Sequence, residues 1–393
     1  MLMERVIVAG GGMAGLRTAE ALRAHGYEGR VMLLAAEDRP PYDRPPLSKE
    51  ILLGKRDDSA LAAPPPDVEL LLGRAATGLA PGVVRTDAGD LGCDAVVIAT
   101  GAEPIRLPGD GPQHVLRTIG DALRLRAELR PGRRVAVVGA GWIGAEVATA
   151  AARAGCAVTV VEAGNAPLAV AVGEDVGRRT EGWYAEAGVT LRTGAAVAAV
   201  RDGGLELADG GTVPAEVVVS GIGVRPAVGW LAGSGLELGD GVHVDAYLRA
   251  AEGVYAVGDC AAFVSRRYGR RLRIEHWDTA VNAPEVVAAN LTGGGPDGPE
   301  AYDPVPYVWS EQFGRMLQYA GRHDPASVPL WRGDPADGSW SAFWLTGERL
   351  AAMLTVDRPR DLVQARRLMR RGARVDPARL ADPELPVKAA EEG

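Results

Sequence analysis

Apolar and polar residues follow the same order in two separate stretches of the chain, residues 5–37 and 134–162. In each, a valine-containing apolar run is followed by a glycine-rich turn, an alanine-rich segment and a second apolar run that leads to a glutamate. Short unbroken apolar runs are typical of strands buried in a parallel sheet, whereas alanine favours helix. The pattern therefore predicts strand, helix and strand at 5–9, 13–25 and 30–35, and again at 134–138, 142–154 and 157–161.

Three further apolar runs, at 94–100, 217–220 and 254–257, each lead directly to a glycine and predict additional buried strands. After about residue 305 aromatic residues become more frequent. Alternating segments at 340–345 and 350–356 flank Thr346-Gly347-Glu348-Arg349, which predicts a β-hairpin. Residues 360–371 have the spacing of a basic amphipathic helix, and we expect residues 388–393 to be frayed.

The composition is that of an ordinary globular protein: of 393 residues, 47% are hydrophobic and 24% are charged. The formal net charge of -8 argues against a general nucleic-acid binder, which needs a basic surface. No apolar run approaches the ~18 residues of a membrane helix, and the N-terminal apolar run continues into a glycine turn instead of a cleavage site. We therefore expect a soluble, cytoplasmic protein, whose oligomeric state the sequence leaves open.

The three cysteines, Cys93, Cys156 and Cys260, are far apart and form no CxxC pair. This spacing favours neither a disulfide framework nor a cysteine-rich metal site. We expect small buried core residues in a reducing compartment, and no metal.

Gly10-Gly11-Gly12-Met13-Ala14-Gly15 follows the first predicted strand and opens the first predicted helix. In a GxGxxG turn the first glycine permits the tight turn, the second lets the backbone approach a pyrophosphate, and the third lets the helix pack on the strand. Free N–H groups at the helix N-terminus then bind the phosphates. Glu37 ends the second strand segment, where a carboxylate accepts from ribose hydroxyls. Together these features predict a dinucleotide site.

Gly139, Gly141 and Gly144 meet the same requirements independently. Glu162 follows Gly139 by 23 residues, close to the usual spacing of about 20. Two such sites indicate two dinucleotides, one held permanently and one exchanged, with a flavin between a nicotinamide and another redox partner. No Arg or Lys between Glu162 and Arg178 offsets a 2′-phosphate, so we predict NADH over NADPH.

These elements predict an α/β fold with two Rossmann-like dinucleotide-binding domains and a C-terminal α+β domain. The first domain is discontinuous, with residues 1–110 and 237–304, and is expected to bind FAD. Residues 111–236 form the expected NAD-binding domain, and residues 305–393 form the expected α+β domain.

Several stretches also resemble one known family. They are Pro41-Tyr42-Asp43-Arg44-Pro45-Pro46-Leu47-Ser48-Lys49, Ala99-Thr100-Gly101, Gly221-Ile222-Gly223-Val224-Arg225-Pro226, Val254-Tyr255-Ala256-Val257-Gly258-Asp259, Arg273-Ile274-Glu275-His276-Trp277 and Trp309-Ser310-Glu311-Gln312. In this order they resemble the NADH-dependent ferredoxin reductases that serve Rieske dioxygenases and haem monooxygenases, the putidaredoxin-reductase-like group. The resemblance implies an enzyme that passes electrons from NADH through FAD to a small iron–sulfur ferredoxin.

The resemblance also implies roles for individual residues. Arg44 and Lys49 would contact FAD, Asp259 would bind its ribityl or pyrophosphate part, and Trp309 would lie beside the isoalloxazine. Ile143, Glu146, Glu162 and Gly223 would line the NADH site, with Glu275 near the nicotinamide. Lys49, Glu146 and Trp309 are the candidate catalytic residues. The candidate cofactor-binding residues are Gly10, Gly12, Met13, Ala14, Gly15, Glu37, Arg44, Lys49, Ala99, Thr100, Gly101, Gly139, Gly141, Ile143, Gly144, Glu146, Glu162, Gly223, Gly258, Asp259, Glu275, His276, Trp277 and Trp309.

Five of these residues keep an alternative. Glu162 could point to solvent while a distant Arg contacts the 2′-phosphate. Lys49 beside a flavin would stabilise the anionic reduced ring, or it is a surface lysine after a proline turn. A carboxylate at Glu146 is favoured near a helix N-terminus by the dipole alone, and Asp259 could be a helix N-cap. Trp309 could be plain core. After Glu162 the family often has Leu-x-Arg, whereas residues 167–172 of this chain contain no Arg, which leaves the local nicotinamide-side contacts open.

Two arginine groups are candidate docking surfaces on an acidic protein. Complementary charge on either would steer an acidic ferredoxin, although each could also be a solvated face. The first group is Arg266, Arg267, Arg270, Arg271 and Arg273; the second, at helical spacing, is Arg366, Arg367, Arg370 and Arg371.

Relatives of this fold that react through a thiol carry a cysteine beside the flavin, but residues 35–49 contain none. The expected reaction is therefore hydride transfer from NADH to the flavin and release of single electrons, without a protein thiol. Rubredoxin reductase, monodehydroascorbate reductase and an NADH-sensing flavoprotein resembling apoptosis-inducing factor stay as alternatives. No nucleic-acid or membrane partner is expected.

Overall fold

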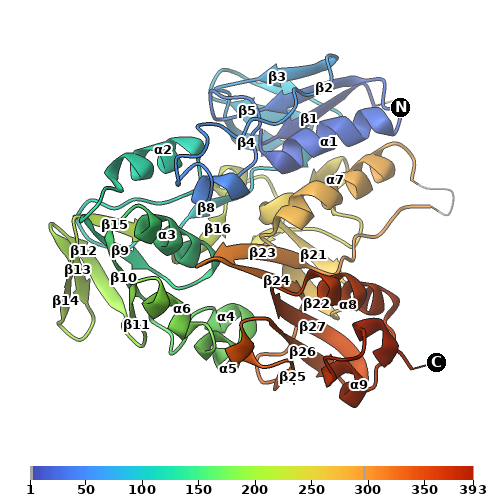
Figure 1. The fold of residues 1–393 in the computed structure, drawn as a ribbon. Helices are drawn as coiled ribbons and strands as arrows, with labels where there is room; N and C mark the ends of the chain where they lie inside the picture. The colour runs from blue at the N-terminus through green and yellow to red at the C-terminus, as the bar shows by residue number, and fades with distance from the viewer. Residues whose placement is uncertain (1–2, 295–297, 393) are drawn as a thin grey trace. The chain divides into compact units, whose positions relative to one another are not determined.

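A mainly parallel sheet carries the first glycine turn. The structure is a computed structural model that describes residues 3–294 and 298–392, and it divides into two compact units, which we describe separately. The first unit comprises Met1–Asp43, Ser59–Glu103 and Val224–Pro304. Its six-stranded sheet has the order β19-β20-β7-β1-β2-β3 (Figure 1). The bounds are β1 Arg5–Ala9, β2 Arg30–Leu34, β3 Val68–Leu71, β7 Ala95–Ile98, β19 Arg249–Ala251 and β20 Val254–Ala256.

All neighbours in this sheet are parallel except β19 and β20. The unbroken apolar sequence of β1 is explained by complete burial of Val6, Ile7 and Val8. Helices α1 (Met13–Ala24) and α7 (Trp277–Leu291) pack side by side (Figure 1). Alanines on the buried side of each helix permit this close approach.

Short strands in smaller sheets complete the first unit. One small sheet contains β4 Ala76–Ala80, β5 Val83–Thr86 and β6 Leu91–Gly92; another contains β17 Leu238–Gly239, β18 Gly241–His243, β21 Ala261–Ser265 and β22 Arg270–Arg273. Strand β8 (Ala102–Pro104) pairs with β16 (Val224–Pro226), and single 3-10 turns cover Gly229–Leu231 and Gly258–Cys260.

The second unit comprises Arg44–Asp58, Pro104–Gly223 and Val305–Gly393. The second glycine turn lies in a parallel sheet of order β11-β10-β9-β15. Its strands are β9 Arg134–Val138, β10 Ala157–Val161, β11 Thr190–Arg192 and β15 Val217–Ser220, and a separate antiparallel sheet contains β12 Val197–Arg201, β13 Gly204–Leu207 and β14 Thr212–Pro214. The helices are α2 Ile119–Glu128, α3 Trp142–Arg153, α4 Ala169–Val172, α5 Glu174–Arg178 and α6 Glu181–Glu186, with a 3-10 turn at Pro45–Ser48.

A five-stranded antiparallel sheet of order β23-β24-β27-β26-β25 follows in the same unit. Its elements are β23 Tyr307–Gln312, β24 Arg315–Gly321, β25 Leu330–Arg332, β26 Trp340–Thr346, β27 Arg349–Val356, α8 Pro359–Arg371, α9 Pro377–Ala381 and 3-10 turns at Pro335–Asp337 and Val387–Ala390. Helix α8 packs on β24 and β27, as Figure 1 shows. On the other face Trp340 and Trp344 pack with Trp183 of α6. The predicted fold class, including the β26–β27 hairpin, is confirmed.

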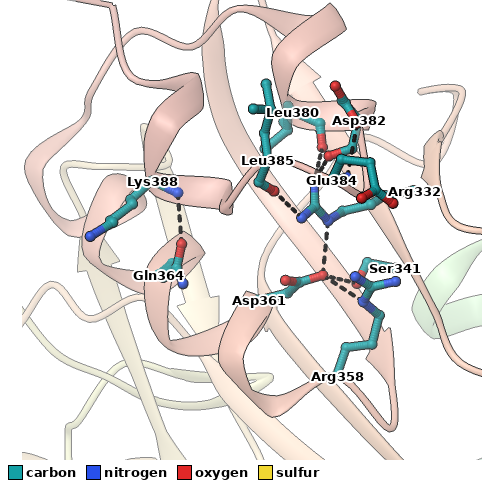
Figure 2. A network of polar contacts seen from close by, with 10 residues as sticks. All are labelled: Arg332, Ser341, Arg358, Asp361, Gln364, Leu380, Asp382, Glu384, Leu385 and Lys388. Carbon is teal, nitrogen blue, oxygen red and sulfur yellow. Dashed lines mark hydrogen bonds and ion pairs between the residues drawn. The ribbon is translucent and has the colours of Figure 1, made fainter.

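A buried arginine holds the end of the chain against this sheet (Figure 2). The Arg332 side chain on β25 is only 2% exposed, and its Nε donates to Asp361 Oδ2 at 3.0 Å. The remaining guanidinium nitrogens donate to the backbone carbonyls of Leu380, Asp382 and Leu385. One guanidinium thus connects α8, α9 and the segment after α9, and we call this contact the arginine clamp.

The structure corrects two expectations from the sequence. Residues 388–392 are not frayed, because Val387 and Ala390 are fully buried and Val375 forms a β-bridge with Glu391; Gly393 lies outside the described residues. Cys93 and Cys156 are only partly buried, whereas Cys260 is buried as expected. The three-domain division stays a prediction. Within the described part of the chain, no helix is long and apolar enough to cross a membrane.

Candidate functional site

The first glycine turn is built so that two of its glycines are required by the fold itself. Gly10 has φ +129°, and a Cβ there would lie 2.2 Å from the carbonyl oxygen of Ala99 at the end of β7. A Cβ on Gly15 would lie 1.8 Å from the Gly10 carbonyl oxygen. Neither position therefore accepts a side chain, and the backbone of Ala99 lies against the turn.

Gly12 differs, because its backbone does not need glycine. Its φ of -86° suits any residue, and a Cβ added there would meet no atom within 4 Å. Gly12 also precedes Met13 at the start of α1, whose N-terminus receives no side-chain cap. Open space above uncapped N–H groups fits a pyrophosphate that approaches the backbone.

Other predicted residues of the first unit gather near this turn. Gly258, with φ +71°, would bring a Cβ to 3.1 Å from the Cβ of Ala14, so the 3-10 turn that contains Asp259 lies beside α1. Thr100 donates to the Ala227 carbonyl at 2.8 Å, next to Gly101 with φ +69°. The turn, the end of β7 and the start of the 3-10 turn therefore form one surface.

Glu37 lies beyond the strand on which it was expected. Strand β2 ends at Leu34, so Glu37 belongs to the following loop, where its Oε2 accepts from the Tyr42 hydroxyl at 2.7 Å. This bond holds the carboxylate in place.

The segment Glu275-His276-Trp277 leads into α7, with His276 at the N-cap position. Trp277 Nε1 donates to Asp43 Oδ1 at 2.8 Å, and Glu275 forms an ion pair with Arg273 at 2.5 Å. Burial raises the pKa of Glu275, and the Arg273 guanidinium opposes that shift.

The second glycine turn repeats the geometry of the first. Gly139 has φ +96° and its Cβ would lie 2.5 Å from the Gly221 carbonyl oxygen, while a Cβ on Gly144 would lie 2.0 Å from the Gly139 carbonyl oxygen. Gly141 has φ -76° and open space around its Cα, and α3 begins after it without a side-chain cap. In each turn, the open space at the middle glycine lies at the uncapped helix N-terminus and suits a pyrophosphate. We call each of these arrangements a cradle.

The Glu162 carboxylate is held beside the second glycine turn by two backbone hydrogen bonds. Its Oε2 accepts from the backbone N–H of Ala140 at 2.7 Å, and its Oε1 accepts from the N–H of Gly164 at 2.7 Å. The carboxylate thus lies at the end of β10, where ribose hydroxyls bind in folds of this type. Of the other predicted residues, Ile143 is 45% exposed, and Gly223 has φ +102°.

Glu146 is the centre of a buried polar network that the sequence does not predict. Glu146 is only 2% exposed. Its Oε2 accepts hydrogen bonds from Lys49 Nζ at 2.7 Å and from the Ser48 hydroxyl. Oε1 accepts from the Ser310 hydroxyl at 2.6 Å. The helix dipole alone therefore does not explain Glu146, because this carboxylate ties α3 to β23 and fixes the Lys49 ammonium.

Trp309 and Arg44 also lie in the second unit. The Trp309 indole is half-buried and stacks on Tyr307, with 5.9 Å between ring centroids and 21° between planes, so it is not plain core. Its neighbour Ser310 reaches Glu146. The Arg44 guanidinium donates to the Arg117 carbonyl.

Two members of the first arginine group are occupied by internal contacts. Arg271 donates to the carbonyls of Val244 and Ala262, and Arg273 pairs with Asp240 and Glu275. Arg266, Arg267 and Arg270 are exposed on or beside the β21–β22 hairpin. The hairpin as a docking surface stays a prediction.

The cysteines have little thiolate character. Burial raises the pKa of Cys260 to about 11, and burial also raises the pKa of Cys93 and Cys156. All three thiols are free, and in the described ranges no group of three or more His, Cys, Asp or Glu side chains could hold a metal ion.

Two dinucleotide cradles, two sheets of mainly parallel strands and a C-terminal antiparallel sheet define a flavoprotein oxidoreductase of the two-nucleotide class. The chain belongs to the pyridine nucleotide-disulphide oxidoreductase family: the family model matches residues 4–283, and a reductase C-terminal model matches residues 307–391. The resemblance recognised in the sequence is thereby confirmed, and membership of this family implies binding of FAD and NAD(H).

Individual relatives cover nearly the whole chain. The ferredoxin–NAD(+) reductase component of the anthranilate 1,2-dioxygenase system of Burkholderia cepacia is 38% identical and matches over 99% of both chains. The crystal structure of Fdr9 is 50% identical, with TM-score 0.93 and coverage of 98% of this chain and 99% of that one. The covalent putidaredoxin reductase–putidaredoxin complex is 31% identical, with TM-score 0.93 and the same two coverages.

Proposed function

We propose that this protein is the FAD-dependent NADH:ferredoxin reductase component of an oxygenase system. The observation that carries the proposal is the pair of cradles at Gly12 and Gly141, in a chain whose thiols are protonated at neutral pH. Relatives that match from end to end are reductase components of dioxygenase systems. When bound, FAD supplies the required chemistry, because it accepts a hydride and gives up electrons singly.

The first cradle is proposed to hold FAD. Uncapped N–H groups at Met13 and Ala14 would receive the pyrophosphate above Gly12. Glu37, oriented by Tyr42, would accept from ribose hydroxyls, and Asp259 would bind the ribityl or pyrophosphate part. We also propose that the other candidate residues of the first unit contact FAD or the nicotinamide nucleotide. They are Ala99 to Gly101 and Glu275 to Trp277.

The second cradle is proposed to hold NADH, with Lys49 and Glu146 as tuning residues. Glu146 Oε2 lies 2.7 Å from Lys49 Nζ. This ion pair holds the Lys49 side chain in one conformation, so that the ammonium is already in position. By the family resemblance, Lys49 and Arg44 would contact the flavin, and Trp309 would lie beside the isoalloxazine. A fixed ammonium there stabilises negative charge on the reduced ring.

We expect Glu162→Arg to lower the NADH/NADPH ratio of kcat/KM by about tenfold or more, since it exchanges a carboxylate that repels a 2′-phosphate for a cation that attracts it. The measurement is steady-state turnover with each nucleotide and ferricyanide. Asp202→Arg, at an exposed position of the same unit, makes the same charge change and serves as the control. An unchanged ratio in Glu162→Arg contradicts the NADH preference.

We expect alkylation with iodoacetamide at pH 7 to leave NADH turnover unchanged. The raised pKa values keep the three thiols protonated at this pH, and the proposed reaction uses none of them. Mass spectrometry follows modification while turnover is measured. A loss of activity in proportion to the labelling of one cysteine would refute the thiol-free route.

The function is tested by NADH oxidation with a panel of one-electron acceptors. Fast turnover with a [2Fe–2S] ferredoxin supports the proposal, and a preference for rubredoxin or monodehydroascorbate points to the rival reductases. Slow turnover with a long-lived charge-transfer absorbance contradicts it and favours an NADH-sensing flavoprotein. The cytoplasmic location expected from the sequence is part of the same proposal.

A further inference from the structure

Helix α8 presents an exposed basic face with one apolar side chain at its centre. Arg360, Val363 and Arg367 recur at helical spacing, all three are exposed, and Val363 is 51% exposed. Among residues 3–294 and 298–392, neither Arg360 nor Arg367 forms an ion pair. We call these three residues the α8 face.

The helix that carries this face is firmly anchored. Its opposite side buries Leu362, Ala365, Leu368 and Met369. Near its start, Asp361 belongs to the arginine clamp, and Gln364 accepts from the backbone N–H of Lys388 at 2.8 Å (Figure 2). A partner that binds the α8 face therefore meets an ordered surface, and little conformational entropy is lost on binding.

Helix α8 is connected to Trp309 through one cation–π contact and one pair of stacked rings. The Arg366 guanidinium of α8 lies over the Tyr307 ring at 4.6 Å from its centroid. Tyr307 in turn stacks on Trp309. Helix α8 is thus linked to a candidate catalytic residue through Arg366 and Tyr307.

We propose that the α8 face is the docking surface for the acidic side of the small iron–sulfur acceptor. This inference rests on the proposed function. An exposed apolar centre with a cationic rim matches the anatomy of a protein interface, and complementary charge speeds encounter. A single exposed valine is too little apolar surface for an interfacial membrane helix. A net charge of -8 disfavours nucleic acid.

The test compares two double variants with equal charge change. Arg360→Ser/Arg367→Ser alters the α8 face, and Arg266→Ser/Arg270→Ser alters the rival hairpin. Each holoprotein is assayed with NADH and an acidic [2Fe–2S] ferredoxin, and separately with ferricyanide. For the α8 double variant we expect kcat/KM for ferredoxin, divided by that for ferricyanide, to fall about tenfold and to depend less on salt. Calorimetry with oxidised ferredoxin should show a similar loss of affinity.

Arg360→Lys/Arg367→Lys should recover most of the loss, because it restores the charge. An unchanged ratio and affinity in the α8 double variant, or a loss confined to the hairpin double variant, overturns the proposal. So does a result in which the α8 double variant loses binding to phosphatidylglycerol vesicles while ferredoxin kinetics stay the same. If the unaltered protein does not reduce ferredoxin at all, the proposed function itself fails.

Discussion

Gly15→Val is expected to yield a protein without bound FAD, colourless after purification and inactive with NADH and every acceptor. Even the first carbon of the new side chain would lie 1.8 Å from the Gly10 carbonyl oxygen, so α1 cannot stay against the turn. The N-terminus of α1 and the glycine turn together form the cradle. Displacement of α1 therefore moves away the N–H groups that are proposed to bind the pyrophosphate. The measurement is the ratio of flavin absorbance to protein absorbance after incubation with excess FAD.

Gly12→Ala provides the matched comparison. Its backbone suits alanine and its Cβ would meet no protein atom, so the apoprotein should fold with unchanged thermal stability. FAD affinity should nevertheless fall by about tenfold or more, because the methyl group occupies the space left for the pyrophosphate. Normal FAD retention in Gly15→Val, whatever the result with Gly12→Ala, would show that the first turn does not hold the flavin.

Arg332→Met is expected to destabilise the second unit by about 3–5 kcal/mol, the usual cost of removing one partner of a buried ion pair. Methionine retains much of the aliphatic stem, so the loss comes from polar groups and not from a large cavity. The variant leaves the carbonyls of Asp382 and Leu385 without their donor and weakens the hold on Asp361. Urea unfolding measures the change, and limited proteolysis should show earlier cleavage after α8.

Arg379→Met is the control for this variant. Arg379 lies on α9 in the same segment, but its side chain is exposed and donates to no clamp residue. Its substitution should change stability by less than about 0.5 kcal/mol. If both variants unfold at the same urea concentration as the unaltered protein, the arginine clamp does not contribute to stability.

Helices and strands whose formation depends on residues adjacent in the sequence could be predicted from the sequence. The predicted helix at 142–154 is observed as α3 Trp142–Arg153, because glycine turn, alanine content and apolar flanks all act locally. Strands β12 to β14 have no such signal, since they are three to five residues long and several of their residues are partly exposed. The tail at 388–392 is ordered by side chains on α8 and β25 that local patterning does not reveal.

The candidate site shows the same distinction. The glycine positions follow from a local motif, and their backbone geometry is as the motif requires. Glu146 and Lys49 are each recognisable by resemblance, but their ion pair joins residues 97 apart in the chain, and the Ser310 bond spans 164 residues. Arg332 carries no sequence signal at all, because the carbonyls that it binds are backbone groups of ordinary residues.

The sheet of the first unit has a consequence for how the protein is made. Strand β7 ends at Ile98, but its parallel neighbour β20 begins only at Val254, 156 residues later. At roughly 5–20 residues per second, a ribosome needs roughly 8–30 s to supply the missing neighbour. During that time one edge of β7 is unpaired and open to wrong pairing. Gly258, which completes the surface beside α1, emerges later still, so this surface, the proposed site of the flavin, is complete only late in biosynthesis.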